Sequence, residues 1–270
     1  GGLGARRYDS FQGHTGAYIA SRSVAGAVHD WYYDKTGSRW ESSEKNLDSL
    51  KQYIMRAYEV ASRYAADRLR ISGSMVRKFP TTLAMAYAEK TENEVIVHIV
   101  WAGDSRVYLL DANGLSQLTR DDTDVEDALE NLTSDAPMKN VLSADGDFEL
   151  NYKAIRLEEP VLLLAATDGC FGYIPSPVEF EGVILQKLIA SETPRQFRDR
   201  LCEELADYAG DDIAMGILSF NFGTFEQTKK ILGKRFEMLN SQYLSKISDD
   251  EAESRKTVWS QYRENYEKYL

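Results

Sequence analysis

Three short acidic motifs contain the residues of this sequence that are best suited to chemistry. They are Gly-Asp-Ser-Arg at 103–106, Thr-Asp-Gly at 167–169 and Asp-Asp-Ile-Ala at 211–214. Each motif adjoins an apolar run that is typical of a buried strand. A carboxylate is costly to desolvate and is therefore a poor residue for a core. Hard divalent cations take oxygen ligands, so the pattern indicates metal chemistry at the ends of strands.

The elements that must position these motifs follow two different periodicities. Apolar residues recur at three- and four-residue steps in some segments, which predicts helices at 16–30, 46–71, 178–190 and 194–208. Other segments are short apolar runs bounded by turn residues, which predicts strands at 81–88, 95–101, 107–111, 115–118, 150–157, 161–166 and 213–220. A weak helical pattern covers the acidic segment 121–136.

The order of the predicted elements indicates how they are arranged. The strands between 81 and 118 are expected to form one antiparallel meander, and 150–157 is expected to pair with 161–166. Helices come first, then strands, then helices and a closing strand. This order is typical of an α+β domain built from packed layers.

The order of the acidic motifs also resembles that of a known family. Gly-Asp-Ser-Arg, then Thr-Asp-Gly, then Asp-Asp-Ile-Ala is similar to the metal-dependent Ser/Thr protein phosphatases of type 2C. The segments 79–84 and 13–21 resemble the family's Gly-Thr-Thr-Ala strand opening and its first long helix. The resemblance covers about residues 1–221. It implies an α/β/β/α four-layer sandwich of two antiparallel sheets, with metal ions at one edge.

The resemblance also implies a role for individual residues. Asp168 and Asp211 match aspartates that bind one core metal, and Asp104 matches a ligand of a third, weaker site. Two or three Mg²⁺ or Mn²⁺ ions would activate a water that hydrolyses phosphoserine or phosphothreonine esters, with no catalytic side chain beyond the metal ligands. Asp212 stands where the family has Asn. The alternative for Asp104 and Asp168 is that they are turn residues, and Arg106 is expected to be structural.

The sequence departs from the family at its start. The family has an earlier stretch with a phosphate-binding Arg, a Glu-Asp pair and an Asp-Gly-x-Gly-Gly loop whose aspartate bridges both metals. Either Gly1 replaces that aspartate, or Gly1 and Gly2 are the last glycines of the loop and the aspartate lies upstream. Two functions therefore stay open: an active phosphatase, or an inactive pseudophosphatase that serves as a binding or scaffold module. The residues upstream of Gly1 would discriminate between them.

The C-terminal segment has a pattern of its own. Residues 224–247 have helical spacing, and Ser-Asp-Asp-Glu at 248–251 is a capping-box sequence ahead of a second helix to about residue 269. We therefore divide the chain into a phosphatase-like domain at 1–221 and a helical hairpin extension at 222–270. The extension packs on its own core or contacts a protein partner or a second copy of the chain. On this division, deletion of 224–270 is expected to spare phosphatase activity.

Composition limits the other classes of function. The chain has 270 residues and a net charge of −11, which argues against binding to nucleic acid. No apolar run approaches the length of a membrane span. Cys170 and Cys202 give no disulfide framework, so we expect a cytoplasmic protein whose partner is a phosphorylated protein substrate. The three histidines, His14, His29 and His98, are too scattered for a zinc signature.

Overall fold

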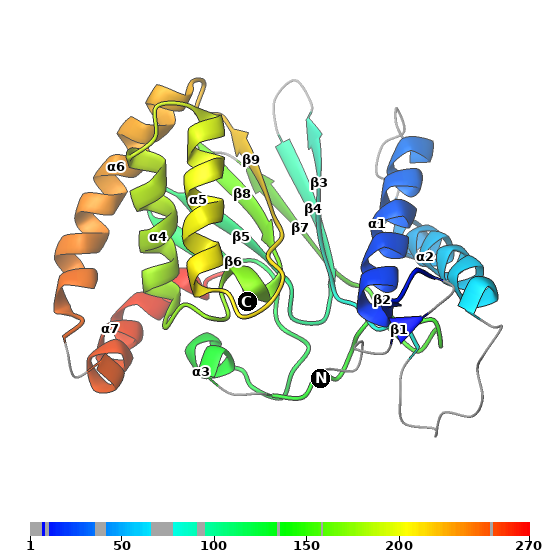
Figure 1. Ribbon diagram of the computed structural model, residues 1–270. Helices are drawn as coiled ribbons and strands as arrows, with labels where there is room; N and C mark the ends of the chain where they lie inside the picture. Colours follow the sequence, from blue (N-terminus) through cyan, green and yellow to red (C-terminus); the bar gives the residue numbers. More distant parts are fainter. Residues whose placement is uncertain are drawn as a thin grey trace. The chain divides into compact units, whose positions relative to one another are not determined.

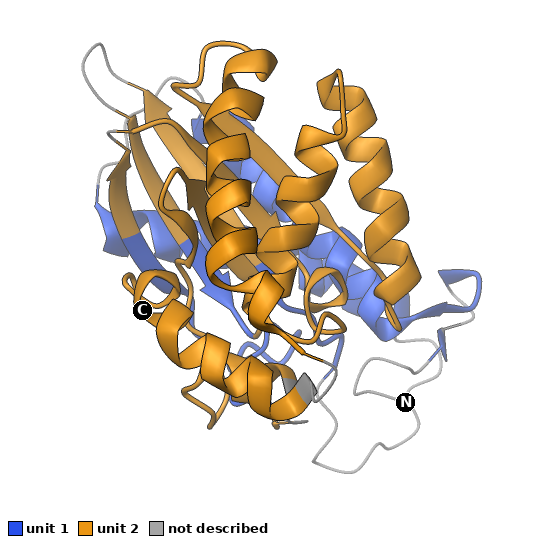
Figure 2. Ribbon diagram, turned by 90° about the vertical axis from the view of Figure 1, so that its left-hand side faces the viewer, with its two compact units in different colours: residues 1–83, 100–103, 138–153 blue, residues 84–99, 104–137, 154–270 orange. Residues whose placement is uncertain are grey.

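A computed structural model describes residues 7–8, 11–35, 42–65, 78–90, 95–133, 136–157, 159–248 and 251–270. The chain divides into two compact units, whose elements are labelled in Figure 1 and coloured by unit in Figure 2. The first unit consists of residues 1–83, 100–103 and 138–153, and the second of residues 84–99, 104–137 and 154–270. All three predicted metal-binding aspartates belong to the second unit.

The first unit contains two packed helices, α1 (Gly16–Lys35) and α2 (Ser43–Ala65) (Figure 1). Two short strands, β1 (Arg7–Tyr8) and β2 (His14–Thr15), pair ahead of α1. Both helices bury the apolar stripe that their spacing predicts, so the two helix predictions are confirmed. The predicted end of the second helix, 66–71, lies outside the described residues.

Seven longer strands form two sheets. One sheet has the order β3-β4-β7, with β3 (Leu83–Lys90), β4 (Val95–Ala102) and β7 (Asn151–Leu157). The other has the order β6-β5-β8-β9, with β5 (Arg106–Asp111), β6 (Gly114–Gln117), β8 (Val161–Ala166) and β9 (Met215–Phe220). Every pairing in the second sheet is antiparallel. The neighbours β3 and β4 follow each other closely in sequence, a connection too short for a parallel crossover.

The predicted strands are present, but two of their predicted pairings are wrong. The chain changes sheets between β4 and β5, so 81–118 is not one meander, and β7 and β8 also belong to different sheets. The first change occurs at Gly103, whose φ is +92°. A Cβ atom at this position would lie 2.5 Å from Thr82 Cγ2. Turn residues predict that a chain reverses, but they do not specify which sheet receives the next strand.

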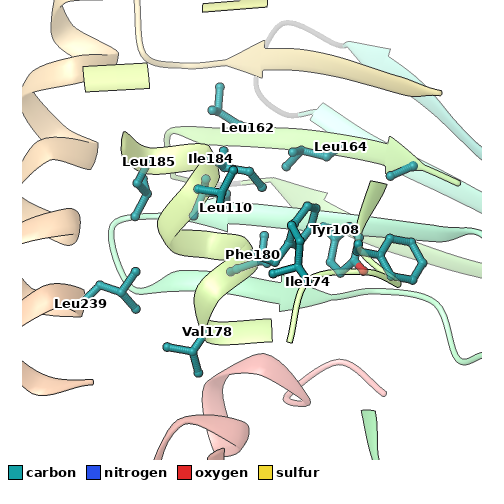
Figure 3. Packing of buried hydrophobic residues seen from close by; sticks show 14 of the residues in the cluster. Tyr108, Leu110, Leu162, Leu164, Ile174, Val178, Phe180, Ile184, Leu185 and Leu239 are labelled. Atoms are coloured by element: carbon teal, nitrogen blue, oxygen red, sulfur yellow. The ribbon is translucent and has the colours of Figure 1, made fainter. Parts of the chain in front are cut away.

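Helices α4 (Pro177–Ile189) and α5 (Pro194–Tyr208) confirm the two predicted helices after β8. Ser176 and Thr193 cap their N-termini, and a proline occupies the first turn of each. Figure 3 shows α4 packed against β5 and β8, where Phe180 and Ile184 lie near Leu110. Within the predicted weak helix at 121–136, the described residues form α3 (Ala128–Thr133), and residues 134–135 lie outside the described residues. No helix in the described part of the chain has the length and apolar character of a membrane span.

The C-terminal segment forms two helices, as predicted. They are α6 (Phe225–Gln242) and α7 (Glu251–Tyr266), joined by a short 3₁₀ turn at Leu244–Lys246. A capping box between Thr224 and Gln227, which the sequence analysis missed, starts α6. The predicted box at 248–251 includes residues 249–250, which lie outside the described residues.

Both C-terminal helices pack into the second unit. Helix α6 packs against α4, and α7 packs mainly against β6. Their buried side chains join the hydrophobic cluster of α4 and β5 (Figure 3 labels one of them, Leu239). Arg235 of α6 also forms a buried ion pair with Glu181 of α4, with Nε 2.6 Å from Oε1. The boundary at residue 221 therefore stays a prediction for the family domain, but packing does not stop there.

Candidate metal centre

The antiparallel pairing of β5, β8 and β9 places the three predicted aspartates at one edge of the sheet. Asp104 precedes β5, Asp168 follows β8, and Asp211 precedes β9. The register pairs Arg106 with Ala166 and Ala166 with Met215. In antiparallel neighbours the start of one strand lies beside the end of the next, so the three motifs meet at this edge.

The loops that carry Asp168 and Asp211 are joined by two hydrogen bonds between Thr167 and Ala214. The Thr167 N–H donates to the Ala214 carbonyl at 3.0 Å, and the Ala214 N–H donates to Thr167 Oγ1 at 3.0 Å. Gly169 lies against the same loop, because a Cβ at this position would overlap the carbonyl oxygen of Asp212. The glycine of the Thr-Asp-Gly motif is therefore required for this close approach.

Burial and neighbouring charges disfavour the ionised forms of Asp104 and Asp168. Partial desolvation, and then the charge of Asp211, raises the pKa of Asp168. Burial raises the pKa of Asp104 to about 6, and the charges of Asp168 and Asp121 add to the effect. Like charges that share a site are stabilised by a cation between them. The donors are all hard oxygens, so the residues present fit a divalent ion such as Mg²⁺ or Mn²⁺.

The aspartates do not by themselves form a complete ligand set. Within the described ranges, no three carboxylate, thiol or imidazole groups converge closely enough to hold one ion. Asp168 Oδ1 accepts a hydrogen bond from the Gly169 N–H, and Asp211 Oδ1 accepts one from the Asp212 N–H. Asp212 is exposed and contributes its carbonyl oxygen to the contact with Gly169. Such an ion takes about six oxygen ligands, so further donors would complete the set.

Other residues that the sequence analysis considered have separate roles or cannot be placed. Gly1 and Gly2 lie outside the described residues. The His14 ring stacks on Tyr18 with centroids 4.1 Å apart. Cys170 is buried, and its thiol donates to the Ala214 carbonyl at 3.3 Å, which supports its interpretation as a packing residue.

Sequence reasoning missed Asp121, which is the partner of Arg106. The side chains of Arg106 and Asp121 are 2% and 5% exposed, and Arg106 Nη2 lies 2.6 Å from Asp121 Oδ2. This buried pair supports a structural role for Arg106. The charge of Asp121 also acts on Asp104. The available signal was the acidic run that starts at residue 121, because one member of such a run can turn inward to meet a buried arginine.

The raised pKa of Asp104 predicts a pH-dependent cost to stability. The folded state binds this proton more tightly than the unfolded chain, whose Asp pKa is about 3.9. The stabilising contribution is therefore complete below about pH 4 and is lost as the pH rises through about 6. Asp104→Asn should be more stable than wild type by about 2 kcal/mol at pH 7.5 without metal, after allowance for partial solvent screening.

Thermal unfolding in EDTA at pH 4.5 and pH 7.5 measures this effect. We expect Asp104→Asn to melt roughly 5 °C above wild type at pH 7.5. The difference in melting temperature should be smaller at pH 4.5. In saturating Mn²⁺, wild type should melt at the higher temperature instead. An equal difference in melting temperature at both pH values would contradict the assignment of the destabilising charge to Asp104.

Comparison with known proteins identifies relatives of this chain. The family model of protein phosphatase 2C matches residues 2–211. A serine/threonine phosphatase stp from Listeria welshimeri is 27% identical over 214 residues, which cover 76% of this chain and 79% of the relative. The stp phosphatase of Listeria monocytogenes is 26% identical over the same shares of the two chains.

Solved structures have the same fold. The serine/threonine phosphatase PstP/Ppp of Mycobacterium tuberculosis is 21% identical, with a TM-score of 0.52 over 77% of this chain and 83% of that one. The catalytic domain of a serine threonine protein phosphatase PstP, solved in complex with two manganese ions, is 17% identical, with a TM-score of 0.50 over 75% and 80% of the two chains. The predicted α+β class with two antiparallel sheets and flanking helices is thus confirmed.

Proposed function

We propose, from the premise that this chain belongs to the protein phosphatase 2C family, that it is a metal-dependent phosphoprotein phosphatase acting on phosphoserine and phosphothreonine. The observation that supports the proposal is that Asp104, Asp168 and Asp211 all adjoin strand ends at the same edge of the sheet, which is formed by β5, β8 and β9. Carboxylates gathered at one sheet edge destabilise the metal-free protein, and such an arrangement suits an ion-binding site.

The aspartates at this edge would bind different metal ions. Asp168 and Asp211, whose loops are joined through Thr167 and Ala214, would hold one Mg²⁺ or Mn²⁺ ion. Asp104 would serve a further, weaker site in a set of two or three ions. When bound, such ions lower the pKa of a coordinated water and neutralise charge on the phosphoryl oxygens. The exposed position of Asp168 and Asp211 leaves room for the phosphoryl group of a protein substrate.

A second candidate function is a pseudophosphatase that binds without turnover. It is favoured by the absence of three converging donors among the described residues. The two functions differ in one measurable property, because a pseudophosphatase would bind Mn²⁺ or a phosphoprotein without releasing phosphate. The cytoplasmic location and the lack of nucleic-acid and membrane partners stay predictions from the composition.

The test is phosphate release from a phosphothreonine peptide by the full-length protein. We expect hydrolysis that needs Mn²⁺ or Mg²⁺, that EDTA abolishes and that added Mn²⁺ restores, because the nucleophile depends on the ion. Binding of Mn²⁺ in calorimetry without phosphate release would instead favour the pseudophosphatase. Hydrolysis that persists in EDTA would contradict both the metal site and the proposed mechanism.

A further inference from the structure

The buried side chain of Arg106 contacts several elements of the second unit, and we call this group of contacts the Arg106 junction. Its side chain is 2% exposed, and Nε and Nη2 both donate to Asp121, at 2.9 and 2.6 Å. The guanidinium carbon lies 4.4 Å from the centre of the Phe171 ring. The remaining nitrogen, Nη1, lies 3.4 Å from the Tyr108 hydroxyl and 3.5 Å from the Tyr266 hydroxyl.

This junction contacts the segments that carry Asp104 and Asp168, two of the three aspartates of the metal edge. We use this name for the edge of the sheet at which Asp104, Asp168 and Asp211 lie. Arg106 itself lies two residues after Asp104 on the same backbone. Phe171 lies three residues after Asp168, and its N–H donates to the Asp168 carbonyl at 3.0 Å. A displacement of the guanidinium group would therefore be transmitted to the backbone at Asp104 and to the turn at Asp168.

Tyr266 brings the C-terminal helix α7 to this junction. The residue is 1% exposed, and its ring lies 6.3 Å from the Tyr108 ring and 5.4 Å from the Trp259 ring. Neighbouring contacts hold α7 in place: the Trp259 indole donates to Asp127 at 3.1 Å, and Ser116 Oγ donates to the Asn265 carbonyl at 2.9 Å. Helix α7 lies beyond residue 211, where the family match ends.

We propose that Tyr266 is a positioning residue for the metal edge. Its hydroxyl group fixes Arg106, and Arg106 fixes the segments that carry Asp104 and Asp168. The inference rests on the proposed function, because it assigns the C-terminal helix a part in preparing that same metal site. A guanidinium group has five N–H donors in a rigid fork, and a buried donor that loses its partner is costly. Without the Tyr266 hydroxyl, Nη1 would keep only the Tyr108 hydroxyl at 3.4 Å, so the guanidinium group would be held less firmly in place.

The chain offers a matched pair of variants for the test. Tyr266→Phe removes the hydroxyl that faces Arg106 and keeps the buried ring. Tyr262→Phe removes another buried hydroxyl from the same helix, one turn earlier, where it bonds Glu181 and not Arg106. Tyr262→Phe loses the stronger bond, because its acceptor is a buried carboxylate, so a general loss of stability would affect Tyr262→Phe at least as much as Tyr266→Phe.

Two measurements on the full-length protein separate positioning from stability. In the metal-free protein, we expect Tyr266→Phe to speed amide hydrogen exchange in segments 104–106 and 168–172, while Tyr262→Phe leaves these segments as in wild type. In calorimetry, we expect Tyr266→Phe to weaken Mn²⁺ binding roughly 10-fold, which is typical when a group that orients a metal ligand is lost. Tyr262→Phe should bind Mn²⁺ within about twofold of wild type.

The outcomes distinguish this inference from the proposed function. Equal effects of the two variants, or no effect of Tyr266→Phe, would overturn the positioning role even if wild type is an active phosphatase. A wild-type protein that neither binds Mn²⁺ nor releases phosphate would contradict the proposed function. The exchange data would then still decide whether Tyr266 holds the two segments.

Discussion

A chain that ends at Gly223 should lose cooperative folding of the second unit. The deletion of 224–270 removes the buried side chains that α6 and α7 contribute to the shared hydrophobic cluster, which are Leu232, Leu239, Val258, Trp259, Tyr262 and Tyr266. Burial of a large apolar side chain contributes about 1.5–3 kcal/mol, so their loss costs on the order of 10 kcal/mol. That equals the whole stability of many domains.

The deletion also leaves a charge without its partner. Glu181 is 0% exposed and loses both Arg235, which lies 2.6 Å away, and the hydroxyl of Tyr262. Removing one member of a buried ion pair costs about 3–5 kcal/mol, since the remaining charge is uncompensated. The sequence-based expectation that deletion spares activity should therefore fail, because the metal edge belongs to the same unit.

Thermal unfolding followed by circular dichroism measures the outcome. We expect no cooperative transition in the deleted chain, or an insoluble product. Two single substitutions in the same segment test the contribution of buried side chains separately. Trp259→Ala should lower the free energy of unfolding by about 3–5 kcal/mol. Met238→Ala, at an exposed position, should change it by no more than about 0.5 kcal/mol. A deleted chain that melts cooperatively near the wild-type temperature would restore the boundary at residue 221.

Asp168→Asn and Asp211→Asn should each lower Mn²⁺-dependent phosphatase activity on the order of 100-fold or more. Loss of a group that merely orients a metal ligand costs about 10- to 100-fold, and these residues are proposed as the ligands themselves. Asn keeps the side-chain oxygen that accepts from the next backbone N–H, at 2.9 Å for Asp168 and 2.7 Å for Asp211. The loops should therefore keep their shape, and the loss should reflect the charge alone.

In the absence of metal, Asp168→Asn should be more stable than wild type, although it lowers the activity. The pKa of Asp168 is raised, so its ionised form destabilises the folded state as the pH rises, and the uncharged amide removes that cost. Asp199→Asn is the matched control, because it makes the same chemical change at a carboxylate on α5 that pairs with Arg198. Unchanged Mn²⁺ affinity in both Asp168→Asn and Asp211→Asn would show that the metal site lies elsewhere.

The sequence by itself determined most of the helices and strands, and it singled out Asp104, Asp168 and Asp211 as candidate metal ligands. Helix periodicity and short apolar runs are local properties, so α4, α5, β8 and β9 were predicted within about two residues of their bounds. The acidic motifs could also be recognised locally, since a carboxylate directly beside an apolar strand is visible within a few consecutive residues. Their meeting at one edge required only that the strands be antiparallel neighbours.

Tertiary structure alone decided which sheet each strand joins and what α6 and α7 contact. A turn signal reports a reversal of the chain, whereas the choice of sheet depends on pairing energies between distant segments, so the predicted pairing of β7 with β8 was wrong. An amphipathic helix likewise specifies that one face is buried but not against which partner. The contacts of Arg106 with Asp121 and Tyr266 span 15 and 160 residues of sequence. A local pattern such as the acidic run at residue 121 can suggest a candidate, but it does not specify the partner, because these contacts form only when packing brings the segments together.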